Sequence, residues 1–119
     1  MAIAKTHTDL RDRSKSFSIA ILGITKDIQP DHTEKEVLKR LINSGITVGI
    51  NTELAFKSQP RSEFNSHLSI VIDQVLACKF CIDLLINLNT DINLKSAEEI
   101  NNEASELISI FTSLIKKSN

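Results

Sequence analysis

The residues best able to do chemistry in this 119-residue chain are two cysteines, Cys78 and Cys81, in a C-x-x-C arrangement. Such a pair performs thiol redox chemistry when a helix N-terminus lowers its pKa, and it can supply two zinc ligands. Here the pair lies deep within a long predicted helix, so we interpret both thiols as apolar core filling. Zinc would need two more ligands, but His67 lies about three turns away, and His7 and His32 belong to other segments. We therefore predict no metal site.

Catalysis needs a nucleophile, a base and an oxyanion donor that converge, and the sequence suggests no such set. We predict that the protein is not an enzyme, uses no cofactor and has no small-molecule substrate. An enzyme acting in a cleft between subunits is the least favoured of three hypotheses. The formal net charge of −1 and the pI near 6.3 also exclude a general affinity for polyanions. Only a local basic patch could bind nucleic acid or an acidic membrane surface.

The composition favours long helices and a reducing compartment. Trp and Tyr are absent, and Gly and Pro number only three and two, a balance that disfavours a turn-rich sheet. A secreted disulfide framework would need more cysteines in separate segments. No apolar run of signal-peptide length opens the chain, and no charge-free segment is long enough to span a membrane. We expect a soluble, cytoplasmic, all-α protein with no membrane contact.

The start of the chain lacks the apolar periodicity of the rest. Residues 1–12 are polar and mixed in charge, so we predict a flexible leader, followed by one helical domain over residues 13–119. Ser14 is a candidate N-cap for the first helix, which stops at Gln29-Pro30 because proline disfavours helical geometry in the residue before it. The apolar seam of this helix has a four-three-four spacing: Phe17, Ile21, Ile24 and Ile28.

Capping signals place the other helices. Thr33 and Glu36 form an S/T-x-x-E capping box that opens the second helix, which ends before Pro60, and the third follows over residues 64–88. The fourth begins near Asn93 or Ser96, with Ser96 and Glu99 as a capping box. The opposite face of the fourth helix is predicted to face solvent: Glu99, Asn102, Glu103 and Glu106. Short connections between long helices predict an antiparallel up-down-up-down four-helix bundle.

The third helix is apolar on two sides. One seam has alternating steps of four and three and is predicted to face the core: Phe64, Leu68, Val71, Val75, Cys78, Ile82 and Leu85. A second row lies beside the first: Ile70, Ala77, Cys81, Leu84 and Leu88. A single small bundle can hardly cover this much apolar surface. We therefore expect a partner, most simply further copies of the same chain.

The second helix is also apolar on two sides and carries two glycines, Gly45 and Gly49. Each glycine lowers helix propensity by about 1 kcal/mol, so we predict that they admit a neighbouring helix at close range, with a ligand cleft as the alternative. Asn51 is the polar residue expected to bridge two helices, because buried polar atoms need partners. Its polar neighbours are Ser44, Thr47 and Thr52.

Four basic residues near the ends of the second helix and the start of the third are the candidate nucleic-acid contacts: Lys39, Arg40, Lys57 and Arg61. Lys35 lies near Lys39 in sequence and is the fifth member of this basic group. Acidic residues interleave with them, which favours a solvated face of mixed charge. If several copies of the chain associate, however, a weak patch repeats on each copy, and multivalency can raise its affinity. Nucleic-acid binding therefore stays open.

Two motifs in the second and third helices resemble those of a known family. Its members carry patterns like R-S-x-T-S-I-G-A-N-I, then S-K-x-D/E-F, then L-x-I-A-L. This chain matches those patterns at Ser44, Thr47, Gly49, Asn51, Glu63, Phe64, Leu68 and Ile70. The segments 15–20 and 111–116 are similar to the family's first and last helices, so the resemblance covers roughly residues 13–117. The chain departs from the family at Ala77-Cys78, where relatives usually place an acidic residue and a threonine.

The family is the bacterial four-helix-bundle family of proteins encoded in intervening sequences of large-subunit ribosomal RNA. The accessory variability proteins of diversity-generating retroelements are its wider kin. The resemblance implies a small bundle that assembles into a ring, typically a pentamer. It also implies an alternative function, a nucleic-acid-binding accessory protein that acts with a partner such as a reverse transcriptase. The residues that we expect to form helix and subunit packing are Gly45, Gly49, Asn51, Phe64, Leu68, Ile70, Ala77, Cys81 and Leu84.

Overall fold

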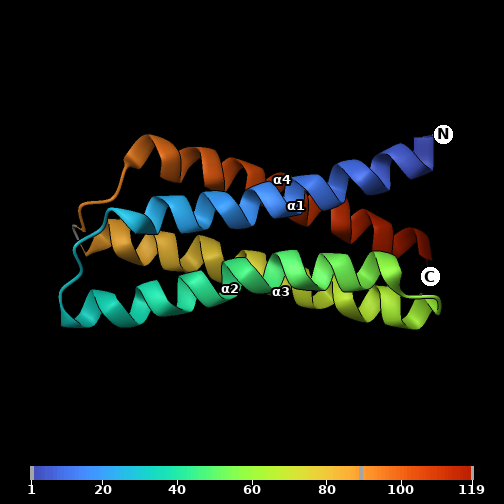
Figure 1. Ribbon diagram of the computed structural model, residues 1–119, viewed down its shortest axis with the longest axis horizontal. Coiled ribbons are helices and arrows are strands. Elements are labelled where there is room, and N and C mark those ends of the chain that lie inside the picture. The colour runs from blue at the N-terminus through green and yellow to red at the C-terminus, as the bar shows by residue number, and fades with distance from the viewer. Residues whose placement is uncertain (1, 89, 119) are drawn as a thin grey trace.

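The computed structural model describes the backbone of residues 2–88 and 90–118, and the side chains of residues 9–88 and 90–117. Within these residues it contains four helices and no strand: α1 (Ala2–Lys26), α2 (His32–Lys57), α3 (Arg61–Asn87) and α4 (Leu94–Ser118). Successive helices run in opposite directions along a rod of 45 × 23 × 19 Å (Figure 1). The predicted all-α four-helix bundle is confirmed.

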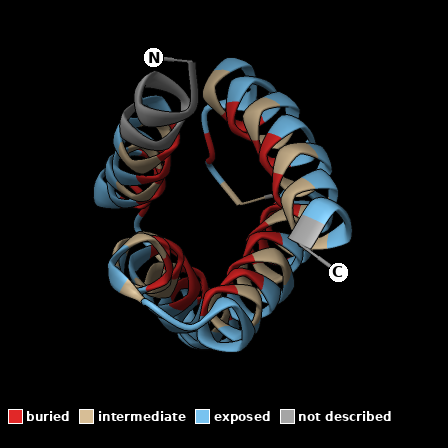
Figure 2. Cartoon of the chain, turned by 90° about the vertical axis from the view of Figure 1, so that its right-hand side faces the viewer, coloured by how far each residue is buried: buried red, intermediate tan, exposed pale blue. Residues whose placement is uncertain are grey.

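The core runs along the inside of all four helices, where Figure 2 shows the buried residues. The predicted seam of α3 is buried throughout, from Phe64 to Leu85. Phe17 and Ile21 from α1 and Leu107 and Phe111 from α4 complete the centre of the bundle. The α2–α3 pair packs most extensively, and the α1–α4 pair packs least. The bundle is therefore tight around α2 and α3 and more open between its first and last helices.

The first helix begins earlier than the sequence analysis predicted. α1 starts at Ala2, so the backbone of residues 2–12, which we had placed in a flexible leader, is helical. Leu10 is only 1% exposed, and Arg11 forms an ion pair with Glu53 of α2 at 2.7 Å. Ser14 is fully buried inside the helix and is not its N-cap. The apolar residues of this segment do not recur at a sustained helical spacing, so its period is too weak to predict a helix.

The capping box of α2 lies two residues before the predicted one. Asp31, not Thr33, is the N-cap, and its carboxylate accepts a hydrogen bond from the Glu34 amide at 2.8 Å. The Glu34 carboxylate accepts one from the Asp31 amide and another from the Thr90 hydroxyl, which ties the start of α2 to the α3–α4 connection. Both candidate boxes have suitable residue types, and an aspartate caps at least as well as a threonine.

The start of α4 is corrected in the same way. Its first turn is capped by Asn93, whose side-chain oxygen accepts a hydrogen bond from the Ser96 amide at 2.9 Å. The alternative start at Ser96, with a capping box to Glu99, is wrong, because Ser96 already lies within the helix. Asn93 was the other start that the sequence allowed.

Candidate assembly surfaces

The two glycines of α2 bring α1 into close contact. The Ser18 hydroxyl of α1 donates a hydrogen bond to the Gly45 carbonyl oxygen at 2.6 Å. A Cβ added at Gly45 would lie 2.7 Å from Cγ2 of Ile21, and one at Gly49 would lie 2.8 Å from Oγ of Ser18. At Gly45 the neighbour is the branched, buried Ile21, so this close approach of the helices needs glycine there. At Gly49 the neighbour is the Ser18 hydroxyl, which would have to turn away and give up its hydrogen bond to Gly45. These contacts lie within one chain and leave no ligand cleft at the glycines.

Asn51 bridges α2 and α3, as the sequence analysis expected. Its Oδ1 lies 3.1 Å from Nδ1 of His67, a distance that fits a hydrogen bond when His67 carries its proton on Nδ1. The Asn51 amide also donates to the Thr47 carbonyl oxygen at 3.2 Å. The neighbouring hydroxyls form hydrogen bonds within α2: Ser44 with Arg40, Thr47 with Asn43 and Thr52 with Val48.

Replacing Asn51 by alanine should lower the free energy of unfolding by about 1 kcal/mol, because a part-buried interhelical hydrogen bond is lost. Urea denaturation measures this difference. In a double-mutant cycle, His67→Ala should remove most of the effect, since each change breaks the same contact. An additive cycle would show that the two side chains do not stabilise each other.

Two of the predicted packing residues, Phe64 and Leu68, lie inside the core of the single chain, where they are 8% and 0% exposed. They contribute to the protomer and are not available to a partner. Ile70 is 41% exposed on the outer side of α3. Ala77, Cys81 and Leu84 border an apolar groove of about 340 Å³ along the α2–α3 edge, together with Glu36, Val37, Arg40 and Phe80.

The two cysteines are buried and not bonded to each other. Burial raises the pKa of the Cys78 thiol to about 12 and also raises that of Cys81. Both thiols therefore stay protonated at neutral pH, the opposite of what thiol redox chemistry needs. Among the side chains that the structure describes, no three His, Cys, Asp or Glu residues are grouped to hold a metal ion. His7 lies outside those side chains.

An outward-facing row of α2 is aliphatic where a solvent-facing row is usually polar. Ile46, Ile50 and Leu54 are 41%, 53% and 44% exposed. On the neighbouring helix, Ile19 and Leu22 are also exposed, and we call Ile19, Leu22, Ile46 and Ile50 the α1–α2 ridge. The sequence analysis missed the α1 half of this ridge. The sequence did contain a signal for it. Ile19 and Leu22 are three residues apart, and neither belongs to the apolar seam of Phe17, Ile21 and Ile24.

The four candidate nucleic-acid contacts fall into two pairs. Lys39 and Arg40 lie in the first half of α2, whereas Lys57 and Arg61 flank the α2–α3 corner. At 1.5 Å per residue the pairs are about 27 Å apart along α2. Lys39 has Glu36 at 3.7 Å, and the Arg61 guanidinium lies 5.3 Å from the Phe64 ring centroid. The four residues therefore do not make one continuous basic patch.

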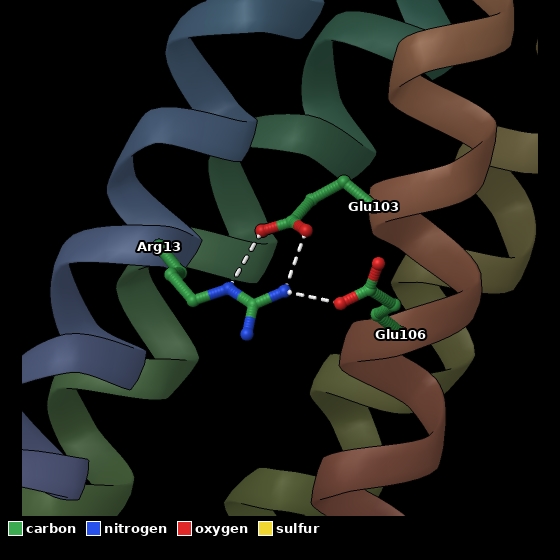
Figure 3. Close-up of polar contacts among 3 residues, drawn as sticks. All are labelled: Arg13, Glu103 and Glu106. Atoms are coloured by element: carbon green, nitrogen blue, oxygen red, sulfur yellow. Dashed lines mark hydrogen bonds and ion pairs between the residues drawn. The ribbon is translucent and has the colours of Figure 1, made fainter.

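The open side between α1 and α4 forms a groove of about 630 Å³. Glu103 in its wall accepts two hydrogen bonds from Arg13, at 2.6 and 2.9 Å, and Arg13 donates a third to Glu106 at 3.1 Å (Figure 3). The sequence analysis had left Glu103 in solvent, but its carboxylate is part-buried and joins α4 to α1. We call this feature the α1–α4 groove; its remaining acidic residues are Asp27, Asp91 and Glu99.

Comparison with solved structures finds a similar four-helix protein. No family model and no curated protein matches the chain. A crystal structure from Bacteroides thetaiotaomicron, described as a protein with unknown function from the S23 ribosomal protein family, is similar with a TM-score of 0.77. The two sequences are 25% identical, and the match covers 90% of this chain and 98% of the other. The likeness extends over nearly the whole bundle and supports the four-helix fold.

No helix in the described part of the chain is both long enough and apolar enough to cross a membrane.

Proposed function

We propose that this protein is a non-enzymatic assembly module, a four-helix bundle whose copies associate into a closed ring, and that it belongs to the family of ribosomal-RNA intervening-sequence proteins. The motif matches in α2 and α3 support the family assignment, as does the similar S23-family bundle. A pentamer is the ring size that the resemblance implies.

The observation that carries the proposal is the aliphatic outward row of α2. A helix of a monomeric bundle normally turns charged and polar residues to water, and contiguous exposed apolar surface marks an interaction site. On α2 the outward row is instead built from Ile46, Ile50 and Leu54, and Ile19 and Leu22 are exposed on the neighbouring helix α1. Association between copies would remove these side chains from water.

Covering the ridge would contribute a limited free energy. Fully burying an isoleucine or leucine is worth about 1.5–3 kcal/mol, and the four ridge residues are each about half exposed. Their burial therefore contributes about 4 kcal/mol per contact. Association costs at least about that much in lost translational and rotational freedom. A stable contact must accordingly include complementary groups around the ridge.

The double variant Ile46→Asp/Ile50→Asp should convert the assembly to folded monomers, since two carboxylates would have to be desolvated at the contact. Light scattering on a gel-filtration column reports the mass, and circular dichroism confirms the helices. Leu76→Asp is the matched control, because Leu76 is 49% exposed on α3, away from the ridge. If the ridge variant keeps the wild-type mass, the outward row of α2 is not a subunit contact.

The nucleic-acid alternative stays a prediction, with a reverse transcriptase as its expected partner. The four basic residues lie in two separate pairs, so a single chain does not present one continuous basic surface for nucleic acid. A titration with labelled RNA at two salt concentrations would test it, because contact with phosphates weakens as salt rises.

A further inference from the structure

A small apolar groove lies along the edge between α2 and α3 and shares no residue with the α1–α2 ridge. Its volume of about 340 Å³ is near the lower end of the range for small-ligand sites in proteins. Its apolar lining consists of Val37 from α2 and of Ala77, Phe80, Cys81 and Leu84 from α3. Phe80 is 63% exposed, so a ligand in the groove would cover a ring that now faces water. We call this feature the α2–α3 groove.

A cation lies at the rim of the α2–α3 groove. Arg40 is part of the lining, and its Nε donates a hydrogen bond to the hydroxyl of the buried Ser44 at 3.0 Å. This bond leaves both terminal nitrogens of Arg40 available, and no carboxylate among the described residues forms an ion pair with them. Burial raises the pKa of the Cys81 thiol and the charge of Arg40 opposes that rise, so the guanidinium lies close to the groove. Arg40 is therefore an unpaired cation held beside an apolar surface.

The acidic residue of the lining, Glu36, does not neutralise Arg40. One helical turn separates the two residues, but the Glu36 carboxylate pairs with Nζ of Lys39 at 3.7 Å instead. On the other wall, Lys79 of α3 donates a hydrogen bond to Ser105 of α4 at 2.6 Å, so it points away from α2. An anion that enters the groove would thus meet the free side of the Arg40 guanidinium, which can bind a carboxylate through two parallel hydrogen bonds.

We propose that the α2–α3 groove binds a small carboxylic acid with an apolar chain, its carboxylate on the Arg40 guanidinium and its chain along Ala77, Phe80 and Leu84. Such an acid is ionised at neutral pH, so the charge of Arg40 is paired while the chain covers the apolar lining. The groove extends about 10 Å along α3, from Ala77 to Leu84, at the helical rise. This is close to the length of an extended octanoate chain, and the small volume favours a free acid over a protein segment.

Isothermal titration calorimetry with octanoate tests the site on the full-length wild-type protein. Octanoate should bind in a saturable manner. Acetate should bind at least about tenfold more weakly, because it lacks the apolar chain. Octylamine has the same chain and the opposite charge, and it should also bind at least about tenfold more weakly, because Arg40 repels it. Equal binding of octanoate and octylamine would overturn the role of Arg40.

Three variants locate the ligand on the protein. Arg40→Gln should weaken octanoate binding by about tenfold or more, because the charged hydrogen bonds are lost. Ala77→Phe places a ring in the groove and should abolish binding. Lys35→Gln is the matched control, since it makes the same charge change at an exposed position of α2 outside the groove, and it should leave binding unchanged. Circular dichroism confirms the helices of each variant, and Arg40→Gln decides the matter if Ala77→Phe does not fold.

Several results would overturn the inference. Wild-type protein that does not bind octanoate would do so, as would a folded Arg40→Gln or Ala77→Phe variant that binds octanoate as tightly as the wild type. If the wild type does not bind octanoate and Ala77→Phe lowers the mass in light scattering, the groove holds a second copy and not an acid. The proposed self-association is tested separately at the α1–α2 ridge, so the failure of one proposal is distinguishable from the failure of the other.

Discussion

Gly45→Leu should destabilise the bundle by about 3 kcal/mol or more. A Cβ alone would lie 2.7 Å from Cγ2 and 3.0 Å from Cβ of Ile21, a branched side chain that is fully buried. The leucine adds three more carbons at this contact. α1 must then move away from α2, which also breaks the hydrogen bond from Ser18 to the Gly45 carbonyl oxygen. Thermal and urea denaturation measure the loss.

Gly23→Ala is the matched control for this prediction. A Cβ at Gly23 would meet nothing within 4 Å, and alanine favours a helix interior over glycine by about 1 kcal/mol. The alanine variant should therefore be slightly more stable than the wild type while Gly45→Leu is much less stable. Equal stability of the Gly45→Leu variant and the wild type would show that α1 and α2 are not held at the close distance described above.

Leu68→Ala should lower the free energy of unfolding by about 2–5 kcal/mol, because it removes buried methyl groups and leaves a cavity. Leu68 is 0% exposed and sits on the core seam of α3 between Phe64 and Val71. Chemical denaturation of the isolated variant gives the value, and the transition should stay cooperative.

The control for the cavity prediction is Leu76→Ala on the same helix, where the side chain is 49% exposed. Its truncation removes little packing and should change stability by about 0.5 kcal/mol or less. A loss at Leu68 no larger than that at Leu76 would contradict the burial of the α3 seam.

The helical periodicity predicted the fold because apolar residues on α2 and α3 recur strictly at steps of three and four. The seam from Phe64 to Leu85 is buried as predicted, and Asn51 pairs with His67 across the helices. Caps were less predictable, since Asp31–Glu34 and Thr33–Glu36 both satisfy the same local rule. The choice between them depends on tertiary contacts, such as the bond from Thr90 to Glu34.

The α1–α4 side could not be read from the sequence. Arg13 and Glu103 lie 90 positions apart, and nothing in their local sequence indicates that they pair. The early start of α1 was missed for a similar reason. The first turns of this helix are held by long-range contacts: Leu10 is buried in the core, and Arg11 forms an ion pair with Glu53. Whether Lys39, Arg40, Lys57 and Arg61 form one patch could not be read from the sequence; in the structure they are spread along the rod, since α2 separates its own two ends.

The mass of the wild-type protein in solution tests the central claim of self-association most directly. Analytical ultracentrifugation over a dilution series should show one discrete multimer that dissociates at low concentration. A protein that stays monomeric, helical and cooperative in melting at every concentration would contradict the account.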